Sequence, residues 1–197
     1  YGDYGLNSIA FLWAALLEKR IIMPVTATTI PTKELRKIID ADLEFQSGES
    51  TFTPQSPAPS KKTMITELID ISHSGLVLLS SGTTGTPKAV LHDAEKLLRK
   101  YIHSHKQYVT LALMLFDHIA GLDTMFYVIS SGGTLVISPD RKVETLIKVL
   151  QDNAVEVLPA SPSMIHFLLM DDRFCSEYLP ALKVITFGSE RITDDLY

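Results

Sequence analysis

The chain has 197 residues, of which 46% are hydrophobic and 21% are charged, which is typical of a folded globular protein. Its formal net charge of −5 at pH 7 argues against a general nucleic-acid binder. The single cysteine, Cys175, excludes an intrachain disulfide and favours a reducing compartment, so we expect a cytoplasmic protein. No apolar run approaches the roughly 18 residues of a transmembrane segment.

Apolar periodicity and turn residues predict helices and strands that alternate along the chain. In chain order, we expect a helix over 7–19, a strand over 21–25, a helix over 31–39, a strand over 76–79 and a helix over 93–104. These are followed by a strand over 110–116, a helix-length apolar segment over 121–129, a strand over 134–137, a helix over 142–151, a strand over 155–158, a helix over 161–170 and a strand over 182–187. This alternation indicates the α/β class, with a largely parallel sheet and flanking helices.

One polar segment interrupts this alternation. Residues 47–62 are rich in Ser, Thr and Pro, which predicts a variable loop or linker.

The densest motif follows the strand over 76–79. It reads Ser80-Ser81-Gly82-Thr83-Thr84-Gly85-Thr86-Pro87-Lys88. Glycines let the backbone approach an anion closely, and successive N–H groups and hydroxyls can surround phosphate oxygens. Because Lys88 adds a mobile positive charge, the motif predicts a polyphosphate-binding loop before a helix.

Two common phosphate motifs do not match this loop. The Walker form places Lys and then Ser or Thr directly after its second glycine, whereas Pro87 precedes Lys88 here and Ala89 follows it. The Rossmann form G-x-G-x-x-G is absent as well. A Walker-type phosphotransferase is therefore disfavoured, and an ordinary polar surface turn remains as the structural alternative.

The loop resembles the phosphate loop of the adenylate-forming enzymes, which reads Ser/Thr-Ser-Gly-Thr-Thr-Gly-x-Pro-Lys-Gly. The one departure is Ala89, where the family usually has Gly. Further stretches that resemble family segments are Leu115-Phe116-Asp117-His118-Ile119-Ala120-Gly121, Ser131-Gly132-Gly133-Thr134, Leu158-Pro159-Ala160-Ser161-Pro162 and Lys183 to Glu190. The resemblance therefore extends along most of the chain.

The resemblance implies that residues 1–197 are a truncated N-terminal adenylation (AMP-binding) domain, most like those of acyl-CoA synthetases. Such an enzyme activates a carboxylic acid, here expected to be a fatty acid, with ATP and Mg²⁺ and transfers it to coenzyme A or a carrier protein's pantetheine. The family's later motifs, including a glutamate for Mg²⁺ and a C-terminal domain with the catalytic lysine, are expected to lie outside these residues. Truncation would expose sheet edges and favour self-association.

The resemblance also implies roles for particular residues. The residues expected to hold the phosphates are Ser80, Ser81, Gly82, Thr83, Thr84, Gly85 and Lys88, and those expected at the nucleotide are Gly188, Ser189 and Glu190. His118 is expected beside the acid and the α-phosphate as the catalytic residue, and Asp117 beside the substrate. We expect no metal ligand among the residues of the chain.

Four alternatives stay open. Phe116-Asp117 also resembles amino-acid adenylation domains, where the Asp pairs with the substrate's α-ammonium group. A non-catalytic nucleotide-binding module is a second alternative. His118 could lie at a strand end without a chemical role. Asp117 could be a surface residue that caps the next helix.

Overall fold

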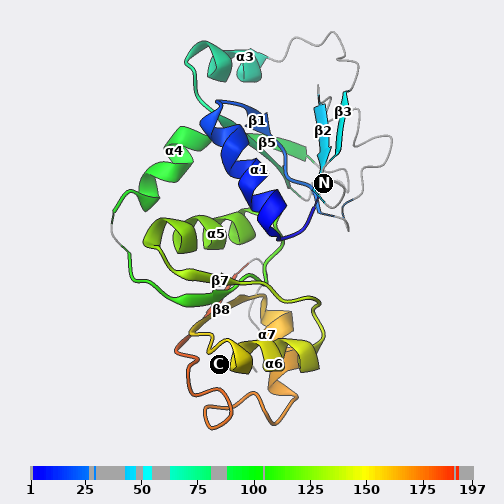
Figure 1. Cartoon of the computed structure of the whole chain (residues 1–197), viewed down its shortest axis with the longest axis vertical. Coiled ribbons are helices and arrows are strands. Elements are labelled where there is room, and N and C mark those ends of the chain that lie inside the picture. Colours follow the sequence, from blue (N-terminus) through cyan, green and yellow to red (C-terminus); the bar gives the residue numbers. More distant parts are fainter. Residues whose placement is uncertain are drawn as a thin grey trace. The chain divides into compact units, whose positions relative to one another are not determined.

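The computed structural model describes residues 2–26, 29, 43–47, 51–54, 63–80, 88–103, 105–188 and 190. The chain divides into two compact units, and each is described by itself (Figure 1). Unit 1 consists of residues 1–100 and 116–119, and unit 2 consists of residues 101–115 and 120–197. Within the described ranges, no helix combines the length and the apolar character that a membrane span requires.

Unit 1 contains a mixed three-stranded sheet and a separate two-stranded hairpin. Its elements are α1 (Leu6–Leu17), β1 (Ile21–Ile22), β2 (Leu43–Gln46), β3 (Thr51–Pro54), α3 (Thr63–Asp70), β4 (Gly75–Ser80), β5 (Lys88–Asp93) and α4 (Ala94–Leu98). The central strand β4 pairs with β1 in parallel and with β5 in antiparallel orientation. The hairpin is made by β2 and β3.

Apolar burial explains the main elements of unit 1. Leu12 and Leu16 lie one helical turn apart on α1 and are buried, as are Leu76 and Leu78, which alternate along β4. The ring of Phe11 on α1 stacks on Phe45 of β2, with ring centroids 4.0 Å apart. This contact joins the helix to the hairpin.

Unit 2 is built on a parallel sheet. Its elements are β6 (Val109–Leu111), α5 (Ile119–Ser131, whose first residue belongs to unit 1), β7 (Thr134–Val136), α6 (Val143–Asp152), β8 (Val157–Ala160), α7 (Pro162–Leu169) and β9 (Val184–Phe187). The strand order is β7-β6-β8-β9, and every pair is parallel. Figure 1 shows α5 on one side of β7 and β8 and helices α6 and α7 on the other.

The core of unit 2 lies between the sheet and helices α6 and α7. Leu146, Ile147 and Leu150 of α6 pack with Leu158 of β8 and Leu168 of α7, and all five side chains are buried. Helix α7 begins as its sequence predicts, because the Ser161 hydroxyl accepts a hydrogen bond from Met164 N–H and Pro162 occupies the first turn. The α/β class and the largely parallel sheet with flanking helices are thus confirmed.

The structure corrects several predicted boundaries. The helix expected over 93–104 is only the short α4, followed by a 3-10 turn at Arg99–Tyr101. At the last residue of this turn, the Tyr101 hydroxyl donates a hydrogen bond to the Asp123 carboxylate. The strand expected over 110–116 is the shorter β6, because residues 112–118 turn before α5 begins.

Strands β2, β3 and β5 have no counterpart in the prediction. β3 lies inside segment 47–62, which we expected to be a loop or linker. β5 occupies positions that we read as the end of the phosphate loop, and most of its side chains are exposed or half-buried. The helix expected over 31–39 lies outside the described residues.

Glu156 joins three strands of unit 2 at their amino ends. Its Oε2 accepts a hydrogen bond from Val109 N–H at 2.9 Å, and its Oε1 accepts one from Lys183 Nζ. Its backbone N–H donates to Val109 O at 2.8 Å, and its carbonyl accepts from Lys183 N–H at 2.8 Å. The Lys183 ammonium, and then the Val109 N–H, lower the pKa of Glu156 below its ordinary value of 4.5.

We predict that Glu156→Gln destabilises unit 2 at neutral pH but not in acid. Because the folded pKa lies below the unfolded value, the charged carboxylate stabilises the fold above about pH 4.5, and this contribution is lost as pH falls through the folded pKa. Thermal unfolding at pH 7 should therefore give a lower midpoint for the variant, and the difference should vanish once the pH falls below the folded pKa of Glu156. The exposed Glu177→Gln, outside any helix or strand, serves as the matched control. Equal midpoints at pH 7 would contradict the prediction.

Candidate functional site

The predicted phosphate loop joins two adjacent antiparallel strands. Ser80 is the last residue of β4 and Lys88 the first of β5, and they are paired across the ladder. The Ser80 hydroxyl donates to the Lys88 carbonyl at 3.3 Å. The residues between them, 81–87, lie outside the described residues and include Ser81, Gly82, Thr83, Thr84 and Gly85. The two ends of the motif therefore lie side by side, at the last residue pair of the β4–β5 ladder.

A strand, rather than the helix we expected, follows this loop. The helix N-terminus that commonly supports bound phosphate is thus not adjacent to the motif in sequence. Any phosphate held here would depend on the N–H groups and hydroxyls of the loop and on Lys88. The Lys88 side chain is exposed and can reach a ligand.

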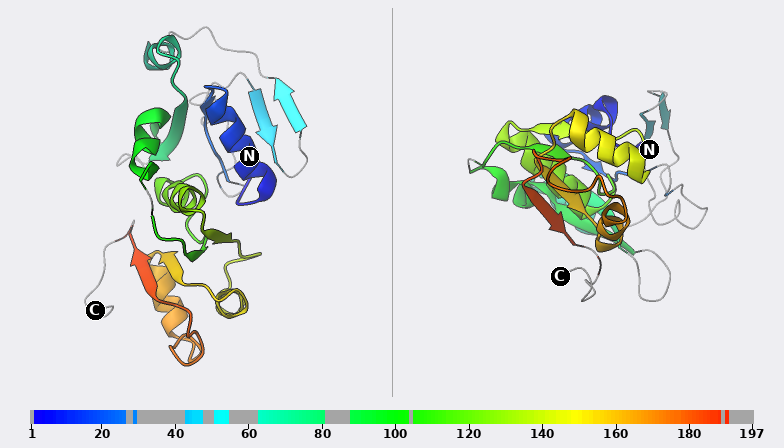
Figure 2. Two further views of the ribbon diagram at one scale, coloured as in Figure 1. Left: turned by 60° about the vertical axis from the view of Figure 1, so that its left-hand side comes forward. Right: turned by 90° about the horizontal axis from the view of Figure 1, so that it is seen from below.

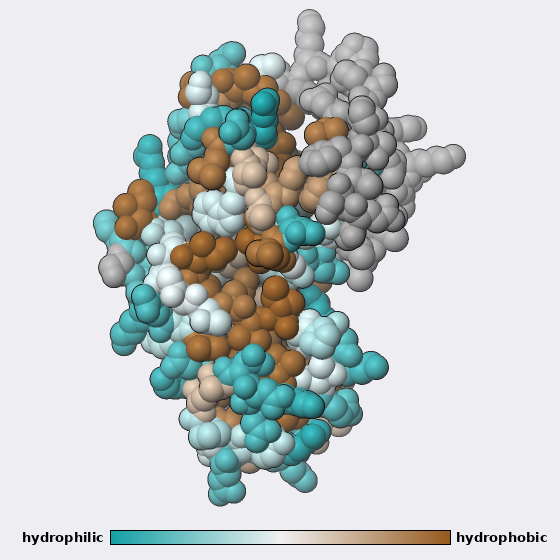
Figure 3. Space-filling view, viewed as in Figure 1, coloured by the Kyte–Doolittle hydropathy of each residue, from teal (hydrophilic) through white to brown (hydrophobic). Residues whose placement is uncertain are grey.

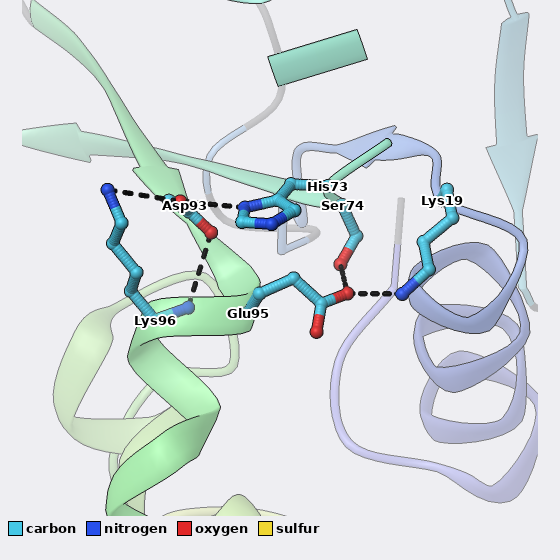
Figure 4. Close-up of polar contacts among 6 residues, drawn as sticks. All are labelled: Lys19, His73, Ser74, Asp93, Glu95 and Lys96. Carbon is cyan, nitrogen blue, oxygen red and sulfur yellow. Dashed lines mark hydrogen bonds and ion pairs between the residues drawn. The ribbon is translucent and has the colours of Figure 1, made fainter. Parts of the chain in front are cut away.

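The other end of β5 is fixed by a polar cluster that the sequence did not predict (Figure 4). Asp93 is the N-cap of α4, and its Oδ1 accepts from Lys96 N–H at 3.2 Å. Its Oδ2 lies 2.9 Å from His73 Nδ1 and 3.4 Å from Lys96 Nζ. Burial acts to raise the pKa of Asp93, but the hydrogen bonds from His73 and Lys96 outweigh burial and lower it below 3.8.

The same cluster includes residues from three further positions of unit 1. Glu95 Oε1 accepts from Ser74 Oγ at 3.5 Å and forms an ion pair with Lys19 at the end of α1. The Lys19 hydrogen bond is the main cause of a lowered pKa at Glu95. These contacts tie α1, the start of β4 and α4 together, as Figure 4 shows. The hairpin that carries the motif is therefore anchored at its base.

We predict that Asp93→Ala destabilises the chain by about 1 kcal/mol, whereas Asp93→Asn costs less. Asn caps a helix as well as Asp does, so the Asn variant loses only the charge-assisted contacts to His73 and Lys96. Urea unfolding at pH 7 would measure both midpoints. Equal midpoints for the two variants would contradict a capping role for Asp93.

Asp117 and His118 lie in the turn before α5. Asp117 is only 5% exposed, and its Oδ2 accepts from the Thr26 N–H at 3.1 Å and from the Thr26 hydroxyl at 3.0 Å. Its Oδ1 is buried and, within the described part of the chain, accepts no hydrogen bond. Oδ1 lies 3.8 Å from His118 Nε2. Asp117 is therefore not the exposed helix cap that the sequence left open.

His118 differs from its neighbour in being largely accessible, with 57% of its side chain exposed. The preceding residue, Phe116, is buried and meets the Tyr4 ring edge-on at 5.1 Å. This aromatic contact and the Thr26 hydrogen bonds hold residues 116–119 in unit 1. A fixed carboxylate thus stands beside an accessible imidazole, which can donate or accept a proton.

The predicted nucleotide residues lie after β9 in unit 2. Among the described residues, no atom lies within 4 Å of the position that a Cβ on Gly188 would take. Glu190 Oε2 accepts from the N–H of Ser163 at 3.2 Å and from its hydroxyl at 2.5 Å. The hydrogen bond from the Ser163 hydroxyl, and then the one from the Ser163 N–H, lower the pKa of Glu190. Ser189 lies outside the described residues.

The structure therefore gathers the site residues in three places. Ser80 pairs with Lys88, Asp117 adjoins His118, and Gly188 and Glu190 lie near the start of α7. Sequence reasoning missed Thr26, although a polar residue directly after the buried strand 21–25 was an available signal. Among the described residues, no three His, Cys, Asp or Glu side chains gather in a way that could hold a metal ion.

The sequence model of the AMP-binding enzymes matches residues 15–197 of the chain. This match spans nearly the whole chain, and the protein therefore belongs to the AMP-binding enzyme family. The adenylate-forming resemblance of its motifs is confirmed by this membership.

Two curated relatives are similar at the level of sequence. The D-alanine–D-alanyl carrier protein ligase of Bacillus velezensis is 27% identical over 222 residues, which cover 98% of this chain and 43% of that protein. The 4-coumarate–CoA ligase-like 9 of Arabidopsis thaliana is 28% identical over 138 residues, covering 65% of this chain and 24% of that protein. The chain thus spans less than half the length of these relatives.

A solved structure shows the same fold. The inhibitor-bound N-terminal domain of FACL13 from Mycobacterium tuberculosis superposes with a TM-score of 0.54 at 21% identity, covering 63% of this chain and 33% of that chain. The similarity places the described elements within the architecture of N-terminal domains of adenylate-forming enzymes.

Proposed function

We propose that the protein carrying this chain is an ATP-dependent ligase that activates a carboxylic acid as an acyl-adenylate and passes it to a thiol. The observation that carries the proposal is the β4–β5 hairpin, whose neck holds Ser80 and Lys88 at the two ends of the phosphate motif. Family membership supports the reaction class. The thiol would belong to coenzyme A or to a carrier protein's pantetheine arm. We further propose that residues 1–197 form the first part of the adenylation domain and that the catalytic-lysine domain lies outside them.

In the first step, the acid's carboxylate attacks the α-phosphate of ATP and pyrophosphate leaves. The motif from Ser80 to Lys88 would hold the β and γ phosphates, and Lys88 would meet the charge that develops on the leaving pyrophosphate. Mg²⁺ accompanying ATP would neutralise phosphate charge. Because little covalent chemistry falls to the protein, alignment of the two reactants is its main contribution.

His118 is proposed as the catalytic residue at the acid and the α-phosphate. Its exposed imidazole can donate a hydrogen bond to the attacking carboxylate or to a phosphate oxygen. The Asp117 carboxylate, 3.8 Å from the ring, would orient it. Gly188, Ser189 and Glu190 are proposed at the nucleotide, because they follow β9 in the stretch that resembles the family's adenine pocket.

We propose a fatty or other acyl acid as the leading substrate class. The reason is the resemblance to acyl-CoA synthetases of the segment Phe116-Asp117-His118-Ile119-Ala120-Gly121. A specific observation also favours an amino acid. Asp117 is buried with an oxygen that accepts no hydrogen bond in the described residues, and such an oxygen suits a substrate ammonium group. The similarity to a D-alanine–D-alanyl carrier protein ligase over 98% of the chain supports this second candidate.

ATP–pyrophosphate exchange in the whole protein tests the proposal. A panel should include a fatty acid, 4-coumarate, D-alanine and L-alanine, each with ATP and Mg²⁺. Exchange driven by one class establishes adenylation and separates the two candidates. Exchange with none of these acids, from a protein that still binds ATP, would favour a non-catalytic nucleotide-binding module instead.

We predict that Lys88→Ala lowers kcat/KM for ATP in this exchange by about tenfold to a hundredfold. A hydrogen bond to a charged group contributes about 1.5–3 kcal/mol, which corresponds to that range. Lys88→Arg should retain most activity because it keeps the charge. Lys148→Ala removes an exposed lysine of α6 and serves as the control. Unchanged ATP kinetics in Lys88→Ala would refute the role of Lys88.

We also propose that this chain self-associates through β9. Figure 2 shows β9 (orange-red) beside β8, and β9 is an edge strand of the described sheet. Val184, Ile185 and Phe187 are all exposed on it, the last by 53%. Brown apolar patches are also visible among polar residues on the face shown in Figure 3. An unpaired apolar edge is a template for pairing with another chain.

Sedimentation velocity of the chain over a range of concentrations tests this prediction. We expect concentration-dependent association of the unmodified chain and a monomer for Ile185→Lys, since a charge on an edge strand opposes pairing. Ile185→Val preserves the apolar edge and is the control. A monomer at every concentration would contradict the proposal.

A further inference from the structure

Thr26 makes an unusual contact for a residue with no assigned role. It is fully buried, with 0% of its surface exposed, and both of its donors serve one oxygen of Asp117. Its hydroxyl is also 3.1 Å from the hydroxyl of Thr29. Because the single Thr26 hydroxyl proton is donated to Asp117, Thr26 Oγ1 accepts from Thr29. A short chain of hydrogen bonds therefore runs from Thr29 through Thr26 to Asp117.

This arrangement fixes the direction of the Asp117 carboxylate. Two donors from one residue define both the position of Oδ2 and the plane in which the carboxylate lies. Rotation of the side chain would break both hydrogen bonds inside a buried site. Oδ1 is consequently held beside His118 Nε2, at 3.8 Å.

We propose that Thr26 is a positioning residue that acts through Asp117 on acid recognition. The inference rests on the proposed function, in which Asp117 and His118 lie at the acid. A purely structural carboxylate would be expected to have both oxygens hydrogen-bonded, because an unpaired buried acceptor is unfavourable. Here Thr26 engages Oδ2 alone, and Oδ1 accepts no hydrogen bond from the described residues. Thr26 thereby holds Oδ1 beside His118 as a buried acceptor that the described residues leave without a donor.

The test is acid-dependent ATP–pyrophosphate exchange with Thr26→Val and Thr26→Ser in the whole protein. Val has the shape of Thr but lacks the hydroxyl, whereas Ser keeps it. We expect Thr26→Val to raise KM for the acid about tenfold with KM for ATP unchanged, and Thr26→Ser to stay close to the unmodified protein. In an Asp117→Ala background, Thr26→Val should have no further effect on acid kinetics.

The outcomes separate the two proposals. No exchange by the unmodified protein overturns the proposed function and this inference with it. Two results would overturn this inference alone. In the first, the acid kinetics of Thr26→Val equal those of the unmodified protein. In the second, Thr26→Val weakens exchange equally whether residue 117 is Asp or Ala. A parallel rise in KM for both acid and ATP would also overturn it, since that pattern indicates a general structural effect.

Asp117→Asn provides a second variant if Thr26→Val does not fold. Both Thr26 groups are donors, so the amide oxygen must face them, and the amide NH₂ then occupies the place of Oδ1. We expect a rise of at least about tenfold in KM for the acid, because a donor replaces an acceptor there. Kinetics like those of the unmodified protein would overturn the proposal, since they would show that the orientation set by Thr26 does not matter.

Discussion

The antiparallel pairing of β4 with β5 is the constraint on which the candidate site depends. It brings Ser80 and Lys88 together, so the phosphate motif starts and ends at one place on a sheet. The far end of β5 is secured by Asp93, which caps α4 and contacts His73. Buried residues of β4 set the position of the whole hairpin. The structure therefore fixes the two strand ends from which the glycine-rich segment starts and to which it returns.

The second constraint is a buried carboxylate. Taking Asp117 out of water is unfavourable unless its oxygens find donors, and Thr26 supplies two of them. The resulting contact lies beside an accessible histidine. A preorganised acceptor next to an accessible imidazole is the kind of arrangement in which reacting groups are oriented before the chemistry begins.

Local patterns predicted the family, the α/β class and most elements of unit 2 because these depend on short-range signals. The phosphate motif, the Ser161-Pro162 helix start and the alternating apolar segments are all readable from neighbouring residues. β5 was missed because its side chains are largely exposed, so its strand character comes from pairing with β4 rather than from burial. Thr26 was missed for a related reason, since its partner lies 91 residues away and no local pattern links the two.

The separation of 91 residues between Thr26 and Asp117 affects how the chain folds and where it can be cut. Residues 116–119 belong to unit 1, while the chain on both sides of them belongs to unit 2. Unit 1 therefore completes its packing only after a long loop has closed, and such closure slows folding. A cut after residue 100 would leave Tyr4 without the Phe116 ring and Thr26 without Asp117. Residues 1–100 alone would therefore lack part of the packing of unit 1.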